Sequence, residues 1–350
     1  MEKITDGGIY RMTMRERVVR ALEHKESDMV PYDVSFTWQA RGNMAKYSGD
    51  SDYCSNRGQH IALYQYWGWP VEIPGSTEQF RDEFGVIWDR SGADKDIGVI
   101  ANPLIPDLDS HSYVFPPIDE RRLRGDLQEL AAAKGGRFVF AGIGFSMFER
   151  AWSLCGMENV LMNMLTGPEE LEELLDAITE RNLQVLDIML EYTIDGVYFG
   201  DDWGQQKGMI MGAPHWRRFI KPRMKRMYER AKQAGRFVAQ HSCGDIAEVF
   251  HDLIEIGLDC YQTFQPEIYD IEKIKREYGA DLAFWGGIST QQLLSRAAPE
   301  EVRHETARIM KIMKTQGGYI AAPTHAISHD IPPENVEAML EVFRNQSRYI

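Results

Sequence analysis

The stretch GVYFGDDW, residues 196–203, is a short apolar run between two glycines that ends in a pair of acids and a tryptophan. Similar short apolar runs recur through the rest of the chain, and longer amphipathic segments separate them. These runs are residues 137–144, 236–241, 258–264, 282–286 and 319–323. Short apolar runs that alternate with helical patterns predict a parallel sheet whose strands are joined by helical crossovers.

The intervening segments carry helix start signals. Proline occurs at Pro168, Pro214, Pro299 and Pro333, and acidic residues follow three of these prolines directly. Proline suits the first helical position because its missing N–H would be unpaired there anyway, and acids suit the positive end of the helix dipole. The earliest helix is predicted after Thr13, where a glutamate three residues on completes a capping box.

No glycine-rich nucleotide-binding motif occurs, neither G-x-G-x-x-G nor G-x-x-x-x-G-K-[ST]. The alternation therefore favours an α/β fold of the (β/α)8 TIM-barrel type, as a single domain over residues 1–350. Val30–Phe36 is predicted as the first strand, and residues 135–345 as the regular barrel repeats. Residues 40–130, rich in aromatics and turn residues, are predicted as an N-terminal excursion of helices and irregular segments that forms a lid.

Composition excludes several classes of partner. The net charge is −14, and no run of basic residues offsets it, so binding to nucleic acid is not expected. No apolar run approaches the roughly 18 residues of a membrane span. Four cysteines in 350 residues are too few for a secreted disulfide scaffold. We therefore expect a cytoplasmic protein without a membrane anchor.

The residues that follow the predicted strands are polar, acidic or able to bind metal. Barrel enzymes place their catalytic groups at the carboxyl ends of the strands, so these residues are the candidates for the active site. They are Ser146, Phe148, Glu149, Asp201, Asp202, Trp203, His241, Cys243, Gln262, Gln265, Trp285 and His325.

His241 and Cys243 are two residues apart, and alternate residues of an extended segment point the same way. Imidazole and thiolate are both zinc ligands. A third ligand must come from elsewhere, and His325 is predicted at the end of the last strand. His329 is the reserve candidate, although its neighbours resemble an exposed turn. A buried cysteine beside a surface histidine is the alternative interpretation of the pair.

Asp201 and Asp202 are adjacent, so only one of them is expected to face the barrel mouth. That residue would orient substrate or manage a proton, and the other would cap a helix or pair with Arg217 or Arg218. Glu149 is a further candidate acid, although it could equally form an ion pair with Arg150. The aromatic residues between 60 and 90 are predicted to be core and lid, not a stacking platform.

Several of these motifs, taken in order, resemble the uroporphyrinogen decarboxylase superfamily, and within it the branch of corrinoid-linked methyltransferases and O-demethylase components. The segments that carry the resemblance are DDWGQ at 201–205, FIKPR at 219–223, HSCGD at 241–245, WGGISTQ at 285–291 and PPENV at 332–336. The resemblance covers residues 135–345 well and the N-terminal third loosely. It implies a TIM-type barrel.

The resemblance also implies a zinc ion held through His-x-Cys and a later cysteine. His241 and Cys243 match the first two positions, and the third falls near residues 322–325, where this chain has His325. A site with two histidines and one cysteine carries less negative charge. It therefore fits a zinc ion that polarises an ether oxygen better than one that activates a thiol.

The resemblance implies that the enzyme moves a methyl group between a small methylated compound, most simply an O-methyl compound, and a corrinoid. No corrinoid-binding motif (Asp-x-His-x-x-Gly) occurs in the chain, so the cobalamin is expected on a separate corrinoid protein. Glu149 and Asp201 or Asp202 are the expected catalytic residues. Phe148, Trp203, Gln262 and Trp285 are expected to bind the substrate.

Two other functions stay open. Decarboxylases of the superfamily share an arginine-rich N-terminal motif that grips the carboxylates of the substrate, but the corresponding segment here, residues 38–42, has one arginine. A lyase acting on a carboxylated substrate is therefore less favoured. A non-catalytic barrel that binds a ligand without metal is the other alternative.

Overall fold

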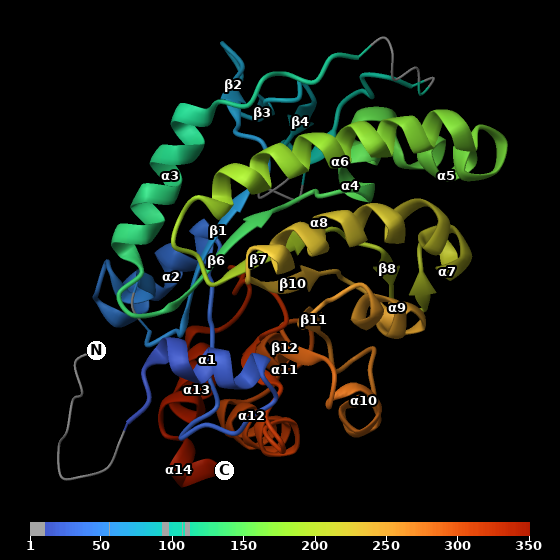
Figure 1. Ribbon diagram of the computed structural model, residues 1–350. Coiled ribbons are helices and arrows are strands. Elements are labelled where there is room, and N and C mark those ends of the chain that lie inside the picture. The colour runs from blue at the N-terminus through green and yellow to red at the C-terminus, as the bar shows by residue number, and fades with distance from the viewer. Residues whose placement is uncertain (1–10, 56, 93–97, 107, 109–112) are drawn as a thin grey trace. The chain divides into compact units, whose positions relative to one another are not determined.

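The computed structural model describes residues 11–55, 57–92, 98–106, 108 and 113–350, and Figure 1 labels its elements. Parts of the predicted excursion at residues 40–130 lie outside the described residues. The chain divides into two compact units. The first unit comprises Met1–Ala62, Ala132–Phe140 and Asp259–Ile350, and the second comprises Leu63–Ala131 and Ala141–Leu258. Each unit is described by itself.

The second unit contains strands whose order is β1-β6-β7-β10, with helices between them. Strands β7 and β10 pair in parallel, with His241 opposite Gly200. The elements that lie in it wholly or in part are β1 (Ile61–Tyr66), α3 (Glu120–Ala133), β6 (Phe138–Ile143), α4 (Phe148–Cys155), α5 (Met157–Thr166), α6 (Pro168–Leu190), β7 (Gly196–Gly200), β8 (Gly204–Gln205), β9 (Gly208–Met209), α7 (Gly212–His215), a π-helical turn (Trp216–Ile220), α8 (Lys221–Gln233), β10 (Phe237–His241), a 3-10 turn (Ala247–Val249) and α9 (Phe250–Glu255). The first residues of β1 and β6 and the last two of α3 belong to the first unit.

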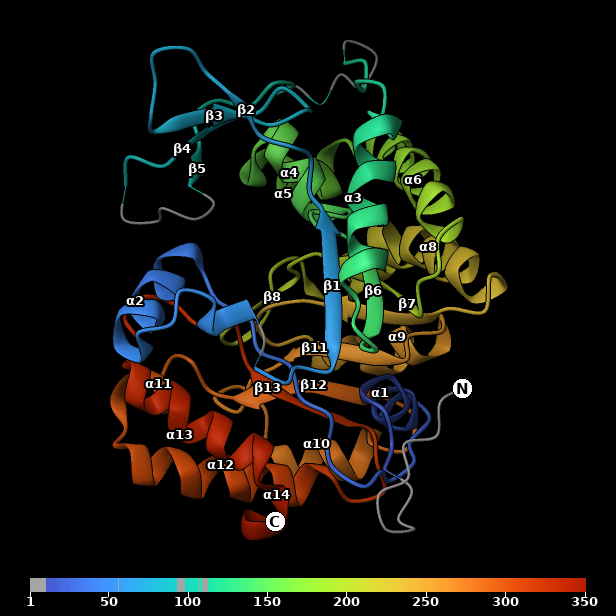
Figure 2. The same ribbon diagram turned by 90° about the vertical axis from the view of Figure 1, so that its left-hand side faces the viewer.

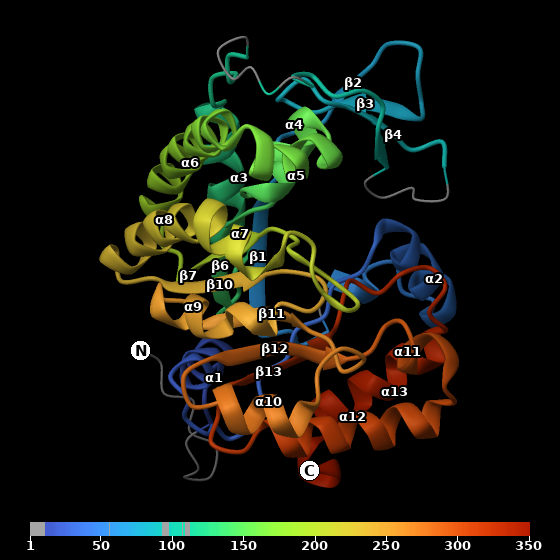
Figure 3. The same ribbon diagram turned by 90° about the vertical axis from the view of Figure 1, so that its right-hand side faces the viewer.

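The first unit contains the strand order β11-β12-β13, paired in parallel throughout. In Figures 2 and 3, α12 and α13 lie side by side along β12 and β13. Its elements are α1 (Met14–Leu22), α2 (Trp38–Ser48), a 3-10 turn (Tyr53–Ser55), β11 (Cys260–Phe264), α10 (Ile271–Tyr278), β12 (Ala283–Ile288), α11 (Leu293–Arg296), α12 (Pro299–Met313), β13 (Tyr319–Pro323), α13 (Pro333–Arg344) and α14 (Gln346–Tyr349).

Six strands occur where the apolar runs predict them, within two or three residues at each end. Every residue of β6, β7, β12 and β13 is buried, which explains why these strands are continuous apolar runs without alternation. Helices α6, α12 and α13 each begin at the predicted proline. The predicted class, α/β with parallel strands, is therefore confirmed. The closed ring of eight strands stays a prediction.

The excursion contains predicted helices, α2 and α3, and also strands that were not predicted. These strands are β1 and a four-stranded antiparallel sheet, β2 (Val71–Glu72), β3 (Gln79–Arg81), β4 (Ile87–Asp89) and β5 (Val99–Ile100), which Figure 2 shows. Strands of two or three residues are too short to show a period of two in the sequence. The predicted first strand, Val30–Phe36, is extended but pairs through isolated parallel bridges, Tyr32 with Ala321 and Phe36 with Ile327.

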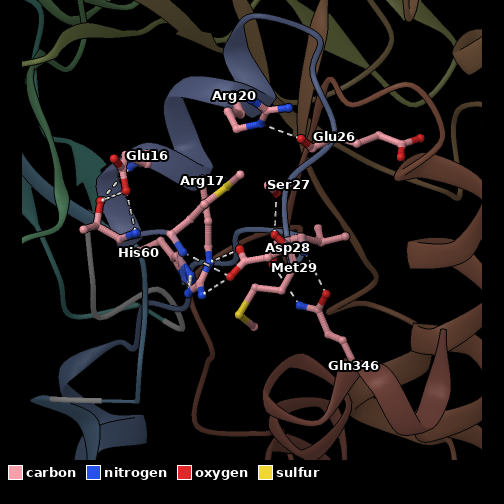
Figure 4. A network of polar contacts seen from close by, with 12 residues as sticks. Glu16, Arg17, Arg20, Glu26, Ser27, Asp28, Met29, His60 and Gln346 are labelled. Carbon is pink, nitrogen blue, oxygen red and sulfur yellow. Dashed lines mark hydrogen bonds and ion pairs between the residues drawn. The ribbon is translucent and has the colours of Figure 1, made fainter. Parts of the chain in front are cut away.

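Helix α1 begins with the predicted capping box, in which the Thr13 side chain accepts from the backbone of Glu16. Figure 4 shows how the helix is anchored: Arg17 forms two hydrogen bonds with the Asp28 carboxylate, at 2.7 and 2.8 Å. The same guanidinium lies 3.2 Å from Nε2 of His60, a residue only 2% exposed. This buried polar network ties the helix to the segment that precedes β1.

Helices cover the strands in each unit. In the second unit, α6 and α8 lie side by side (Figure 1). Buried leucines, Leu171, Leu174, Leu175 and Leu186, recur at helical spacing along α6. Within the described part of the chain, none of the helices combines the length and apolar character that a membrane crossing requires.

Candidate metal and active site

The second unit brings the ends of β6, β7 and β10 together. The backbone N–H of Asp201, just after β7, donates to the carbonyl of His241 at 3.1 Å, and the N–H of Ser146 donates to Gly200 at 2.9 Å. Parallel strands end at a common edge, so the segments that follow them are neighbours. Glu149, in the first turn of α4, therefore lies near the loops after β7 and β10, which carry Asp202 and Cys243.

Asp202, His241 and Cys243 form a compact group of potential metal ligands. One ligand atom from each lies within 4.8 Å of the others. Nε2 of His241 is 3.3 Å from Oδ1 of Asp202 and 3.6 Å from Sγ of Cys243. The sequence predicted that His241 and Cys243 face one point, and the structure brings them together. An imidazole, a thiol and a carboxylate are a donor set that zinc accepts.

The charges in this group are strongly coupled. Burial opposes ionisation of Asp202, but the hydrogen bond and charge of His241, with the N–H of Cys243, lower the pKa of Asp202 to about 2. Burial also disfavours protonation of His241. Its neighbours Tyr198, Cys243 and Asp202 outweigh that effect and raise the pKa of His241 well above its ordinary value. The site therefore holds a carboxylate and, without metal, a proton on the imidazole.

Glu149 lies beside this group. Burial, and then the negative charges of Asp202 and Asp201, raise the pKa of Glu149 well above its ordinary value. Its carboxyl group accepts a hydrogen bond from the backbone of Asp202. A carboxyl group with a raised pKa holds its proton to a higher pH than an ordinary carboxyl group does, a property that suits a general acid.

Asp201 is completely buried, and its carboxylate accepts hydrogen bonds from the backbone N–H groups of Met147, Phe148 and Glu149, between 2.8 and 3.2 Å. It also accepts from the indole N–H of Trp203. Burial, opposed by these hydrogen bonds, raises the pKa of Asp201 to about 6. Of the two adjacent acids, Asp202 joins the ligand group, whereas Asp201 satisfies the start of α4 and so positions Glu149.

Phe148 and Trp203, which the sequence suggested as substrate-binding residues, are completely buried. The backbone N–H of Trp203 donates to Oγ of Ser242 at 2.9 Å, and its ring packs against Trp216 at 5.3 Å. Both aromatic side chains thus belong to the interior of the unit, and Trp203 is tied to the segment that carries His241 and Cys243.

Two glycines allow the DDWGQ and HSCGD segments to approach each other. A Cβ added at Gly204 would lie 2.6 Å from the carbonyl carbon of Gly244, and one added at Gly244, where φ is +76°, would lie even closer to Gly204. The N–H of Asp245 donates to the carbonyl of Gln205 at 2.9 Å. Only residues without a Cβ fit this contact.

The remaining candidates belong to the first unit. Gln262 in β11 and Trp285 in β12 are paired in register, and the Trp285 ring stacks 5.7 Å from Phe140. His325 follows β13 and is exposed. His329 lies in an exposed turn, as its neighbours suggested, and its carbonyl accepts from Asn43.

The sequence predicted that one of the two acids would cap a helix or pair with an arginine, but not that this acid is Asp201 or that the helix is α4. It missed a hollow lined by residues of the excursion, among them Gln65 and Trp67. The aromatic density of residues 60–90 was the available signal. These aromatics were predicted to be core and lid: Phe84 and Trp88, which are 6% and 4% exposed, belong to the core, whereas Trp67 is 45% exposed.

Comparison with known proteins agrees with this architecture. A methyltransferase from Methanosarcina mazei has a TM-score of 0.71 at 17% identity, over 96% of this chain and 100% of that chain. A 3-keto-D-glucoside 4-epimerase from E. coli has a TM-score of 0.40 at 13% identity, over 65% of this chain and 86% of its own. No curated protein matches the chain.

The family comparison covers most of the sequence. The uroporphyrinogen decarboxylase (URO-D) model matches residues 93–346, a span that includes Glu149 and the whole Asp202, His241 and Cys243 group. The chain belongs to the uroporphyrinogen decarboxylase (URO-D) family.

Proposed function

We propose that this protein is a zinc-dependent methyltransferase that moves a methyl group between a small O-methyl compound and the corrinoid of a separate protein. The observation that carries the proposal is the group formed by Asp202, His241 and Cys243, whose ligand atoms lie within 4.8 Å of one another. A structural carboxylate would not need a thiol and an imidazole beside it, whereas a metal site would.

The donor set fits zinc. Cys243 supplies a soft sulfur ligand, His241 an imidazole and Asp202 an ionised carboxylate, and three protein ligands with one open position are the usual arrangement of catalytic zinc. When bound, zinc supplies Lewis-acid polarisation of an ether oxygen. The sequence predicted His325, not Asp202, as the third ligand. Zinc analysis of His325→Ala tests that prediction, because the zinc content should fall only if His325 is a ligand. Thiol ligation suits the reducing cytoplasm.

The residues of the chain have distinct tasks in this reaction. The bond between the methyl carbon and the ether oxygen breaks, and a bond between that carbon and cobalt(I) forms, which oxidises the cobalt to methylcobalt(III). The oxygen leaves with the bonding electron pair and needs a proton. Glu149, whose pKa is raised above all by burial, can donate it. Asp201 holds the backbone that carries Glu149.

The proposal is tested with Cys243→Ala and the matched control Cys155→Ala, which removes a buried thiol elsewhere in the same unit. Zinc content and methylcobalt formation from an O-methyl compound are measured with each. Loss of about 4 kcal/mol of Lewis-acid stabilisation would slow the reaction roughly a thousandfold in Cys243→Ala. Cys155→Ala should keep both zinc and activity. A Cys243→Ala enzyme with full activity would exclude a zinc-centred reaction.

The description of the matching family model favours a second candidate, decarboxylation of a polycarboxylate. The segment at residues 38–42 opposes it because Arg41, on α2, is its one arginine. We expect no decarboxylation of uroporphyrinogen at a useful rate. Turnover near the roughly 1 per second or more that is typical of enzymes would favour the lyase.

A further inference from the structure

Two glycines leave bare backbone beside His241 at the carboxyl ends of the strands. Gly200, the last residue of β7, is in register with His241, so both residues face the same side of the sheet. A Cβ added at Gly200 would lie 3.5 Å from Cα of Gly144, the residue that follows β6. The two strands that precede β10 in the sheet order therefore present this glycine pair, without side chains, next to His241.

The side chain of Gln65, on β1, lies over this glycine pair. The residue before it, Tyr64, points to the helical side of the sheet, since its hydroxyl group donates to Asp126 on α3 at 2.9 Å. Neighbouring residues of a strand face opposite sides, so Gln65 points away from α3. A Cβ added at Gly200 would lie 3.7 Å from Nε2 of Gln65. Because adjacent strands lie about 4.8 Å apart, this nitrogen lies within about 9 Å of Cβ of His241.

Gln65 also lines the hollow of the second unit, which has a volume of about 310 Å³. Most of the remaining wall is aromatic and includes the rings of Trp67, Phe80, Trp88 and Phe145. A cavity of about 150 Å³ is enough to bind benzene, so the hollow has room for a small organic molecule. Trp67 packs on the glycine pair, because a Cβ added at Gly144 would meet its indole at 3.4 Å. The hollow therefore extends to the bare backbone beside His241.

The amide of Gln65 has no hydrogen-bond partner among the residues that the structure describes, and its side chain is partly exposed. The charged groups of the wall, in contrast, are engaged. Asp82 and Arg150 pair at 3.1 Å, and Arg90 lies 4.1 Å over the Phe80 ring. Small-molecule sites are mostly apolar, and a few polar groups in them fix the orientation of the ligand. An amide can do this without charge, since it offers both donors and an acceptor.

We propose that Gln65 determines substrate specificity: its amide binds an uncharged hydroxyl or carbonyl group of the small methylated substrate. The methyl end of that substrate lies over the glycine pair, toward the group formed by Asp202, His241 and Cys243. This placement of the methyl end rests on the proposed function. The hydrogen bond with Gln65 does not, since it requires neither zinc nor a corrinoid.

The test compares two ethers of equal size in ligand-observed NMR titrations. The first, 3-methoxypropan-1-ol, carries a hydroxyl group where the second, 1-methoxybutane, carries a methyl group. We expect saturable binding of the hydroxy ether to the native protein. In Gln65→Leu, the ratio of the two dissociation constants should shift about tenfold in favour of 1-methoxybutane, because the hydroxyl group loses its hydrogen-bond partner and meets an apolar side chain instead. An unchanged ratio would overturn the proposal, as would a lack of binding of the hydroxy ether to the native protein.

Two further variants test where the ligand lies. Gly200→Ala adds a methyl group that makes only ordinary contacts with Gly144 and Gln65, so the fold should persist, as circular dichroism can check. Both ethers should bind more weakly to this variant, because the methyl group occupies the space over the glycine pair. The control Gln128→Leu replaces an exposed glutamine on α3 in the same unit and should leave both dissociation constants unchanged. Unchanged binding in Gly200→Ala would contradict a ligand over the glycine pair.

Cys243→Ala separates this inference from the proposed function. It should bind the hydroxy ether with the affinity of the native protein while it loses methyl transfer. If the ratio of dissociation constants shifts in Gln65→Leu but the native protein forms no methylcobalt from any O-methyl compound, the proposed function is contradicted and the role of Gln65 stands. If methylcobalt forms but the ratio does not shift, the role of Gln65 alone is contradicted.

Discussion

The carboxylate of Asp202 accepts a hydrogen bond from the backbone N–H of Cys243 at 2.8 Å. The same oxygen lies 3.3 Å from Nε2 of His241. Asp202 therefore fixes the position of the loop that carries the thiol and also offers a ligand atom beside it. This side chain adds to the backbone contacts that link the segments after β7 and β10.

Replacement of Asp202 separates its two roles. Asp202→Asn keeps an oxygen that can accept from Cys243 but removes the negative charge, so the loop should persist while zinc binds more weakly. We expect the zinc dissociation constant to rise by at least about tenfold, the lower end for loss of a group that supports a metal site. Competition with a chelator measures it, and circular dichroism checks the fold. Unchanged zinc affinity would return Asp202 to the role predicted from the sequence, that of a catalytic residue that orients substrate or manages a proton.

Replacement of Asp201 should lower the free energy of unfolding more than replacement of an ordinary helix-capping residue does. Asp201→Ala leaves three buried backbone N–H groups at the start of α4 without their acceptor. We expect the free energy of unfolding to fall by about 2 kcal/mol or more, measured by urea denaturation. The matched control is Asp270→Ala, since Asp270 caps α10 through one exposed hydrogen bond to Lys273. A smaller loss for Asp201→Ala than for the control would contradict this account.

Gly244→Ala should disrupt the site directly. Its Cβ would collide with the backbone of Gly204, and its φ of +76° disfavours a side chain in any case. We expect loss of zinc and activity, together with a lower melting temperature. Gly125→Ala serves as the control, because Gly125 lies within α3 and a Cβ there meets nothing within 4 Å. That change should leave zinc unaffected and stabilise the helix slightly.

The sequence predicted the local parts of this architecture. Six strands were visible because buried parallel strands are short apolar runs, and the pairing of His241 with Cys243 followed from the alternation of side chains in extended chain. Long-range relationships were not visible. Asp201 binds backbone groups more than 50 residues away, and nothing in the DDWG segment indicates which of its two acids turns inward. The strands β2 to β5 are too short for any periodicity to reveal them.

His60, which lies against Arg17 of α1, should make the folded protein less stable at acidic pH. Nη1 of Arg17 lies 3.2 Å from Nε2 of His60, and the backbone N–H of Tyr32 lies 3.4 Å from Nδ1. Because both of these groups can only donate, the surroundings of the ring oppose a second proton on it. Burial, and then the charge of Arg17, lower the pKa of His60 to about 4. The unfolded chain, with the ordinary value of about 6.5, binds this proton more readily than the folded protein does.

The sign of the pH dependence follows from that difference. The contribution of His60 to stability is fully present above about pH 6.5 and is lost as the pH falls through about 4. The difference of about 2.5 in pKa corresponds to roughly 3 kcal/mol. Urea denaturation at pH 7 and pH 4.5 should show the loss in the native protein, whereas His60→Gln, which cannot take up a proton, should show a smaller change between the two pH values. His304→Gln, at an exposed position on α12, should behave like the native protein. If His60→Gln loses as much stability between pH 7 and pH 4.5 as the native protein does, the acid sensitivity arises elsewhere.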